Sequence, residues 1–342
     1  MQFMLTRYPV RLMIPSAQAN FEKTFTIGDM MLSNQNPQKI NFLIAGLASI
    51  WLTGCSGSPA QISQSPSPIS NSPSPKEPTE TEQGDSSTDI PKIRSIDELL
   101  LFQPSKYPEG DWTPQDLNYL DVYFESADGT RIHSWYCATE TPVAHILFLH
   151  GNAGNLSGRS RFLKKLQEEH HVSVLCVDYR GYGLSEGKAT AEGAIADAKA
   201  ARKEFAKLAE IKEQDVVLMG RSLGGAIAIQ LAADLKPKGL VVESSFASLK
   251  SVAKHHFPKL AWLVPEEKLN SEAAIKNCTA PVLISHGDRD QVIPDKFGKA
   301  LFAAANEPKR FVTIPGAGHN DRHSPEYDQI FDQFLQSLNS IE

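Results

Sequence analysis

The serine of Gly-Arg-Ser-Leu-Gly at 220–224 is the side chain of this sequence best suited to nucleophilic chemistry. The motif follows a short apolar run at 215–219 and precedes a helix-like run at 226–232. A strand, a G-x-S-x-G turn and a helix in this order hold a serine hydroxyl at a helix N-terminus, where the dipole favours developing negative charge. The five-residue pattern alone is weak, because an ordinary glycine-rich turn between a strand and a helix has the same composition.

Two later loops offer partners for this serine. His-Gly-Asp-Arg-Asp at 286–290 follows an apolar run, and we favour Asp290 over Asp288 because Asp290 lies farther along the loop, before the apolar anchor at 292–294. Gly-Ala-Gly-His at 316–319 follows the run at 310–314. An imidazole can take the serine proton, and a carboxylate can orient the imidazole. We therefore predict Ser222 as the nucleophile, His319 as the general base and Asp290 as its orienting acid.

The loop His-Gly-Asn-Ala-Gly at 150–154 is suited to hold an oxyanion. It directly follows the apolar run at 144–149, and its small residues let backbone N–H groups face an incoming oxygen. An oxyanion needs two such donors, which we assign to the backbone amides of Asn152 and Leu223. The His150 side chain is expected to support the loop. No cofactor is expected, and the adjacent His255 and His256 do not indicate a metal, because neighbouring helical side chains point in different directions.

The apolar periodicity predicts an α/β fold. A hairpin with arms at 117–125 and 131–137 turns at an Asp-Gly pair, which is a strong hairpin signal. Further strands are predicted at 144–149, 172–177, 216–219, 240–242, 281–285 and 310–314, and helices at 159–169, 192–210, 226–235, 295–305 and 325–338. Alternating strands and helices give a mostly parallel sheet covered on both faces, with every strand's carboxyl end at one edge. The loops that carry Ser222, Asp290 and His319 would meet at that edge.

The stretch from about 117 to 338 resembles the α/β-hydrolase superfamily. The residues that carry the resemblance lie at 150–154, 178–187, 220–225, 286–290 and 316–319. Within the superfamily the stretch is similar to small-lid serine hydrolases, the α/β-hydrolase domain-containing proteins that are often classed beside serine aminopeptidases. The resemblance implies an eight-stranded sheet, a triad of Ser222, Asp290 and His319, and a supporting loop at 178–187 that packs an Arg–Asp pair.

The insertion at 246–279 is predicted to be a short lid, with a helix over 248–263. A short lid suggests an open cleft, which favours a carboxylic ester or thioester on a protruding chain or a lipid at a membrane. Two alternatives remain. One is a serine aminopeptidase-like peptidase, whose substrate amine would need an acidic cluster such as Glu266-Glu267; the other is a non-catalytic scaffold that kept the fold.

The first ninety residues differ from the rest in composition. The apolar run at 40–52 is too short to span a bilayer but suits the core of a signal peptide. Leu-Thr-Gly-Cys at 52–55 resembles a bacterial lipobox, so residues 1–55 are predicted to be a signal peptide with its lipobox, in which Cys55 is lipidated. Met30 or Met31 would be a more natural start for it, because residues 1–38 are long for the region that precedes the apolar run. Residues 56–92 form a Ser/Pro-rich tether and 93–342 the hydrolase domain. The predicted product is a membrane-anchored lipoprotein on the periplasmic side.

Charge and cysteine content narrow the possible partners. The 342 residues carry a net charge of −6 and no block of Lys or Arg, which argues against a nucleic-acid partner. Cys137 and Cys176 lie in apolar runs, where a thiol behaves as a small buried hydrophobe. We expect a monomer that acts on a small-molecule or lipid acyl ester or thioester.

Overall fold

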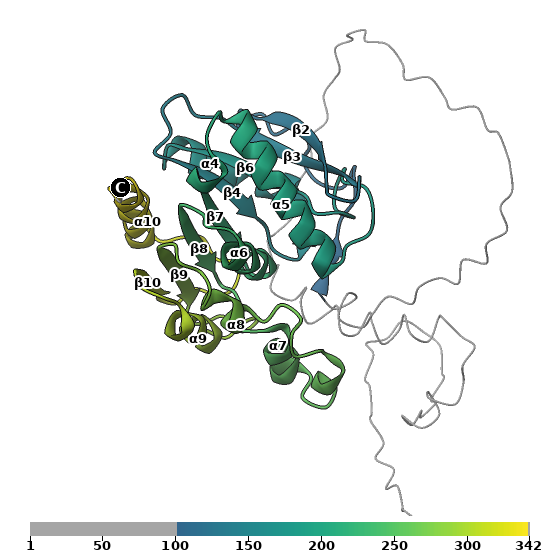
Figure 1. The fold of residues 1–342 in the computed structure, drawn as a ribbon, viewed down its shortest axis with the longest axis vertical. Coiled ribbons are helices and arrows are strands. Elements are labelled where there is room, and N and C mark those ends of the chain that lie inside the picture. Colours follow the sequence, from purple (N-terminus) through teal and green to yellow (C-terminus); the bar gives the residue numbers. More distant parts are fainter. Residues whose placement is uncertain (1–100, 341–342) are drawn as a thin grey trace, which may run out of the picture. The chain divides into compact units, whose positions relative to one another are not determined.

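The computed structural model describes residues 101–340, which form an eight-stranded sheet covered by helices (Figure 1). The strand order is β10-β9-β8-β7-β4-β6-β3-β2. The strands are β2 (Leu120–Glu125), β3 (Arg131–Cys137), β4 (Ala144–Leu149), β6 (Val172–Val177), β7 (Val216–Arg221), β8 (Gly239–Glu243), β9 (Val282–Gly287) and β10 (Lys309–Ile314). β2 and β3 are antiparallel, β3 is antiparallel to β6, and the other pairs are parallel. The predicted α/β-hydrolase fold class is confirmed.

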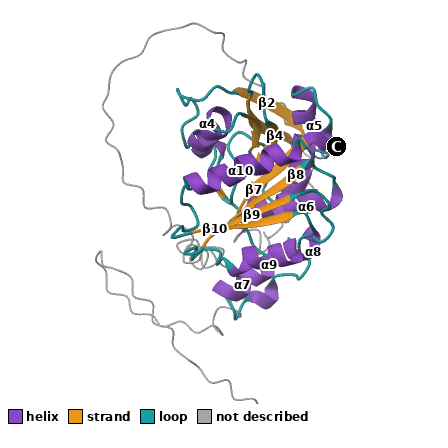
Figure 2. Ribbon diagram, turned by 90° about the vertical axis from the view of Figure 1, so that its left-hand side faces the viewer, coloured by secondary structure: helices purple, strands orange, loops and turns teal. Residues whose placement is uncertain are grey.

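Helices cover both faces of the sheet (Figure 2). The helices are α4 (Ser160–Glu168), α5 (Ala191–Leu208), α6 (Leu223–Asp234), α7 (Leu249–His256), α8 (Ser271–Ile275), α9 (Lys296–Ala304) and α10 (Pro325–Leu338). On one face, Leu163 of α4 and Phe331 of α10 share a core cluster with Trp135 of β3. Tyr136, the next residue of β3, points to the opposite face and contacts Phe205 of α5. The alternation along β3 thus places α4 and α10 opposite α5.

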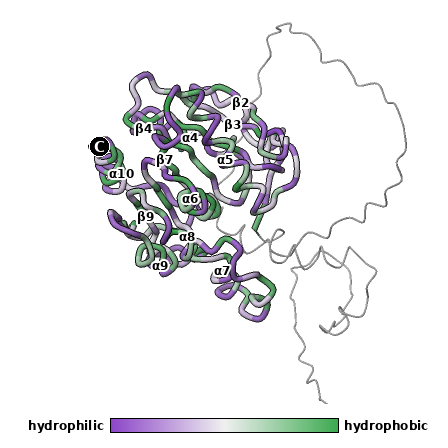
Figure 3. Tube along the Cα trace, viewed as in Figure 1, coloured by the Kyte–Doolittle hydropathy of each residue, from purple (hydrophilic) through white to green (hydrophobic). Residues whose placement is uncertain are grey.

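The central strands explain why their sequences read as continuous apolar runs. Every residue of β6, β8 and β9 is buried, and so are the first five residues of β7. Parallel strands with helices on both faces have no solvent side, so the apolar pattern does not alternate. Polar residues occur where these strands end, at the edge where loops carry Ser222, Asp290 and His319. In Figure 3 the strands accordingly form the hydrophobic interior of the trace.

The predicted helix over 248–263 is wrong in its length. Ser248 caps α7 by accepting a hydrogen bond from the Ser251 amide, but the helix ends at His256. Pro258 disfavours a helical conformation at Phe257, whose φ and ψ are −134° and 62°. The chain resumes as a short 3₁₀ helix, η3 (Ala261–Leu263), so the stretch 248–263 consists of two short helical segments around a proline turn.

Two short elements beside the predicted oxyanion loop were not predicted. β1 (Gln103–Pro104) pairs in parallel with β5 (Ala153–Gly154) as a separate two-stranded sheet. Two-residue strands carry no periodicity, so the sequence holds no signal for them. Their pairing ties the loop at 150–154 to the beginning of the described chain.

The predicted signal peptide, the lipidated Cys55 and the Ser/Pro-rich tether lie outside the described residues. Within residues 101–340, no helix combines the length and the apolar character needed to cross a bilayer. The three cysteines of this part, Cys137, Cys176 and Cys278, are all buried and free.

Candidate active site

Ser222 lies in a strained turn between β7 and α6. Its φ and ψ are 55° and −118°, a conformation that a residue with a side chain rarely adopts. The surrounding structure fixes this backbone: the Ser222 amide donates to the Glu243 carbonyl at 2.9 Å, and the Ser222 carbonyl accepts from Ser245 Oγ at 2.8 Å. Such over-determined strain is typical of functional sites.

The glycines of the turn are required by close packing of backbone on backbone. A Cβ on Gly220 would overlap the carbonyl of Gly224, and a Cβ on Gly224 would overlap the carbonyl of Leu149. Helix α6 therefore lies directly against the ends of β7 and β4, which brings its N-terminus to the sheet edge.

We expect Gly224→Ala to destabilise the fold by about 3 kcal/mol, because the added methyl group meets backbone that cannot move aside. Urea unfolding followed by circular dichroism measures this. Gly158→Ala is the matched control, since a Cβ at Gly158 meets no atom within 4 Å. Equal stability of the two variants would contradict the close packing described here.

The structure brings together the three side chains that were predicted as a set. His319 Nε2 lies 3.1 Å from Ser222 Oγ, and His319 Nδ1 lies 2.7 Å from Asp290 Oδ2. The three residues come from the loops that follow β7, β9 and β10. The Asp290 side chain is fully buried, whereas 9% of the His319 side chain is exposed. A serine hydroxyl, an imidazole and a buried carboxylate in this order can pass a proton from Oγ to Nε2.

Asp290 is held in place by four groups. Oδ1 accepts hydrogen bonds from the amides of Val292 and Ile293 at 2.9 and 2.7 Å. Oδ2 faces two imidazoles, with His286 Nε2 at 3.3 Å and His319 Nδ1 at 2.7 Å. Burial alone would raise the pKa of Asp290, but hydrogen bonds with His286 and His319 outweigh it and hold the pKa well below its usual range.

The other candidate acid, Asp288, has a different partner. Asp288 Oδ1 accepts a hydrogen bond from the Gly316 amide at 2.7 Å. It therefore fixes the turn before His319, while Asp290 meets the imidazole itself.

We expect the Asp290 carboxylate to stabilise the folded state at neutral pH and to lose this effect in acid. A carboxyl whose pKa is lower in the folded state contributes stability above its unfolded pKa of about 4, and the contribution is lost as the pH falls toward the folded value. The free energies of unfolding of the wild type and Asp290→Asn, measured by urea titration across this range, should converge as the pH falls. A constant difference would contradict the expectation.

The predicted oxyanion loop lies beside Ser222. A Cβ on Gly151 would sit 3.6 Å from the Cβ of Ser222. The Asn152 carbonyl accepts hydrogen bonds from the Gln103 amide at 3.1 Å and the Tyr182 hydroxyl at 2.6 Å, which fix the peptide. Leu223 is the first residue of α6. Of the two residues assigned as amide donors, Leu223 directly follows Ser222, and Asn152 directly follows Gly151, which lies beside Ser222.

His150 and the segment at 178–187 support this loop from behind. His150 is fully buried, with Nδ1 2.7 Å from the Gly151 carbonyl and Nε2 3.2 Å from Asp178 Oδ1. Arg180 forms ion pairs of 2.7 Å with Asp197 and Asp128, which is the Arg–Asp packing that the resemblance implied. None of these bonds involves the Ser222 hydroxyl.

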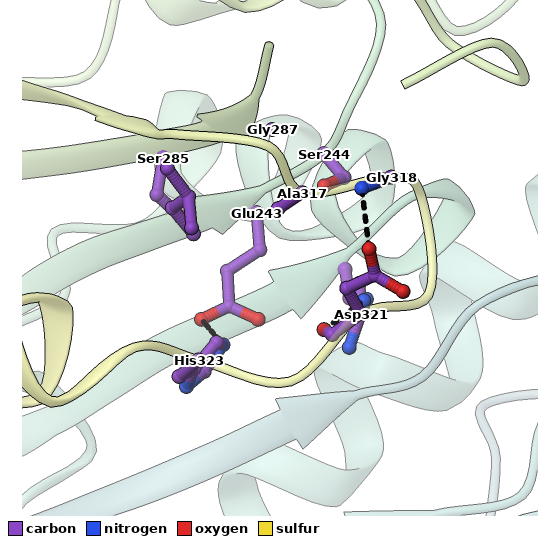
Figure 4. Close-up of a pocket in the computed structure, with 10 residues that line it drawn as sticks. Glu243, Ser244, Ser285, Gly287, Ala317, Gly318, Asp321 and His323 are labelled. Carbon is purple, nitrogen blue, oxygen red and sulfur yellow. Dashed lines mark hydrogen bonds and ion pairs between the residues drawn. The ribbon is translucent and has the colours of Figure 1, made fainter. Parts of the chain in front are cut away.

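A buried polar network behind the site was missed from the sequence (Figure 4). Arg221 Nη2 donates hydrogen bonds to the carbonyls of His319 at 2.6 Å and Asp321 at 3.2 Å. Glu243 Oε1 lies 2.9 Å from His323 Nε2 and accepts from the Tyr327 hydroxyl at 2.8 Å. Arg221 and Glu243 are register partners at the ends of β7 and β8. The network joins the turn of Ser222 to the loop of His319.

Glu243 carries the negative charge of this network. Burial would raise its pKa, but the attraction of His323 and the hydrogen bond with it, together with the charge of Arg221, lower the pKa below its ordinary value. The sequence held one signal for it, a glutamate that ends the otherwise apolar run at 239–243. A charged residue at the end of a strand buried on both faces needs a buried partner.

Within residues 101–340, no group of three His, Cys, Asp or Glu side chains is placed to hold a metal ion. The adjacent His255 and His256 contact each other and their surroundings instead: His255 meets the ring of Phe297, and His256 Nε2 lies 2.7 Å from the Val292 carbonyl.

Comparison with known proteins gives the family. The model of the alpha/beta hydrolase fold matches residues 144–269. The α/β-hydrolase domain-containing protein WAV2 of Arabidopsis thaliana is 32% identical over 235 residues, which cover 61% of this chain and 75% of WAV2. The chain belongs to the α/β-hydrolase superfamily. An uncharacterized protein of Mycobacterium tuberculosis is 37% identical over 239 residues, which cover 67% of this chain and 82% of that protein.

Solved α/β-hydrolase structures share the architecture. A Pyrococcus furiosus esterase superposes with a TM-score of 0.59 at 19% identity, covering 70% of this chain and 98% of the esterase. At this identity the likeness concerns the fold. The chain is therefore an α/β hydrolase by sequence and by architecture, and its chemistry has to be argued from its own residues.

Proposed function

We propose that this α/β hydrolase is a serine esterase or thioesterase that works through an acyl-enzyme intermediate. The observation that carries the proposal is the continuous chain of contacts from Ser222 Oγ through His319 to Asp290. A serine hydroxyl is a weak nucleophile at neutral pH and needs such a base to become reactive. The strained turn, at the N-terminus of α6, supports the same role.

In the first half-reaction, Ser222 Oγ attacks the acyl carbon while its proton passes to His319 Nε2. The tetrahedral intermediate then collapses, the bond from the acyl carbon to the leaving oxygen or sulfur breaks, and His319 gives its proton to the leaving group. The buried Asp290 carboxylate stabilises the imidazolium that forms between these steps. Water, activated by His319, releases the acyl group in the second half-reaction.

The amides of Asn152 and Leu223 are proposed to stabilise the oxyanion of the tetrahedral intermediate. Removing one donor of an oxyanion hole costs about 10²–10³ in rate. Both proposed donors are backbone groups, so point mutation cannot remove them directly. The bonds that hold the Asn152 carbonyl, from Gln103 and Tyr182, offer the indirect route to test the position of this peptide.

Arg221 is proposed as a positioning residue for His319. Its hydrogen bonds to the carbonyls of His319 and Asp321 are charge-assisted, a class worth about 1.5–3 kcal/mol each. We expect Arg221→Met to lower kcat by about 10- to 100-fold with little change in KM, because it displaces the base and leaves the acyl-binding surface intact. Steady-state kinetics with a soluble ester measures kcat and KM separately. Arg202→Met is the control, since Arg202 also donates to two backbone carbonyls, those of Glu213 at 2.9 Å and Lys236 at 3.4 Å, outside the loops of the site. A rise in KM alone for Arg221→Met would contradict the role.

A panel of p-nitrophenyl esters, acyl-thioesters and aminoacyl amides of graded length tests the proposed activity. Hydrolysis of esters or thioesters, with amides at least several-fold slower, is expected. Cleavage of aminoacyl amides alone would favour the peptidase alternative. The peptidase alternative requires an acidic pair that binds the substrate amine. Glu266 of that pair is exposed and already pairs with Lys250 at 2.6 Å, which argues against this role. The scaffold alternative predicts no turnover of any substrate.

We also propose that the chain is a lipoprotein of the small-lid branch, with residues 1–55 as signal peptide and Cys55 carrying the lipid that anchors it on the periplasmic side. The apolar run at 40–52 followed by Leu-Thr-Gly-Cys supports this. Mass spectrometry of the native N-terminus tests it: a diacylated Cys55 as first residue is expected, and an unmodified thiol would contradict it. Size-exclusion chromatography with light scattering tests the expected monomer.

A further inference from the structure

The outer end of the lid exposes an apolar group that the hydrolase chemistry does not use. Leu260, Trp262 and Leu263 are 42%, 73% and 36% exposed. We call these three residues the lid tip. Among residues 101–340, the other exposed large apolar side chains are Tyr107, Leu120, Tyr123 and Leu208. Leu120 and Tyr123 share β2 and the other two lie apart in the sequence, whereas the lid tip places three within four positions.

Buried neighbours and backbone hydrogen bonds hold the lid tip. Ala261, within the lid tip, and Val264, directly after it, are only 6% and 4% exposed and anchor the segment. The Leu263 amide donates to the Leu260 carbonyl at 3.0 Å, and the Val264 amide donates to the Ala261 carbonyl at 3.2 Å. Figure 3 shows this hydrophobic stretch on the protruding turn beyond α7. A fixed turn that keeps Trp262 in solvent is typical of a binding surface.

The charge around the lid tip differs in sign from that of the chain. Residues 249–269 contain four lysines and two glutamates, a net charge of +2, while the whole chain carries −6. Lys254 and Lys259, which flank the turn, are both exposed. Tryptophan favours the interface of a membrane, and lysines beside it are attracted by anionic headgroups.

We propose that the lid tip binds the surface of a bilayer that carries anionic lipids. Trp262 and the two leucines would enter the bilayer as far as the boundary between headgroups and acyl chains, with Lys254 and Lys259 facing the lipid phosphates. The lid also contacts the loop of the proposed acid, since His256 Nε2 lies 2.7 Å from the Val292 carbonyl and the Val292 amide donates to Asp290. Binding through the lid tip therefore keeps the candidate active site close to the bilayer, whether or not Cys55 is lipidated.

The test uses the full chain carrying Trp51→Phe, which leaves Trp112, Trp135 and Trp262 as fluorophores. Vesicles contain dibrominated phosphatidylcholine, alone or mixed equally with phosphatidylglycerol; bromine quenches only tryptophans that reach the acyl chains. We expect quenching with phosphatidylglycerol that disappears in Trp262→Phe. The double change Lys254→Gln/Lys259→Gln should weaken binding to these vesicles by about 30-fold.

Leu120→Ser is the matched control for Leu260→Ser, because Leu120 is 61% exposed and lies on β2, away from the lid. Only Leu260→Ser should reduce the quenching. Absence of quenching from Trp262, or equal quenching without phosphatidylglycerol, would overturn the proposal. Shielding of Trp262 that grows with protein concentration in lipid-free buffer would also overturn it, in favour of a second copy of the chain. Hydrolysis of a soluble ester is read separately, so this proposal and the proposed function can fail independently.

Discussion

Replacing Ser222 by alanine is expected to lower kcat for ester hydrolysis by about 10⁴- to 10⁶-fold. The change removes the atom that forms the acyl-enzyme and leaves the backbone of the turn in place, since the bonds that fix it run through the Ser222 amide and carbonyl. Residual turnover should reflect binding and oxyanion stabilisation alone. Initial rates with a p-nitrophenyl ester, measured beside the wild type, test this.

The double variant Ser222→Ala/His319→Ala tests whether the two residues act as a unit, and thermal unfolding tests whether the fold is intact. Because a nucleophile and its base act as a unit, the double variant should be no slower than Ser222→Ala alone. Unchanged thermal unfolding of Ser222→Ala shows that the turn is intact. A Ser222→Ala protein that keeps kcat within tenfold of the wild type would show that another residue is the nucleophile.

Asp290→Asn is expected to lower kcat by about 10³- to 10⁴-fold. Asparagine fits the same space but carries no charge, so the imidazolium formed during acylation loses its stabilising carboxylate, and the amide no longer fixes the tautomer with the proton on Nδ1. Because the pKa of Asp290 is held low, the carboxylate stays charged in the range where imidazoles titrate. Protonation of Asp290 should therefore not cause a loss of wild-type activity in that range.

Asp288→Asn is the matched control for this change. Asp288 lies two residues earlier in the same loop and bonds the Gly316 amide, an acceptor role that the asparagine carbonyl oxygen can also perform. Its kcat should stay near that of the wild type. If the two variants lost activity equally, the loop as a whole, and not the carboxylate against His319, would control the rate.

The sheet was predictable because the parallel strands have no solvent side. Runs such as 172–177 and 282–285 are apolar apart from one serine each, and the structure buries all of their residues. The length of the helix predicted over 248–263 was wrong because one local feature, Pro258, ends the helix before it.

The part of the candidate site that was predictable is the set of residues that directly follow the strands. Ser222, Asp290 and His319 each follow a predicted strand, and parallel strands bring those ends to one edge. The supporting bonds were not predictable, because each joins residues far apart in sequence. Arg221 reaches the carbonyls of His319 and Asp321, and Glu243 meets Tyr327, only after the chain has folded.

Labelling with a fluorophosphonate tests the central claim most directly. This reagent bonds only to a serine that a neighbouring base has activated, so it reads the contact between His319 Nε2 and Ser222 Oγ without knowledge of the substrate. Intact mass and peptide mapping of the full chain should show one adduct, located on Ser222, lost in Ser222→Ala and strongly slowed in His319→Ala. A folded wild-type chain that takes up no label, or takes it up at another residue, would contradict the account.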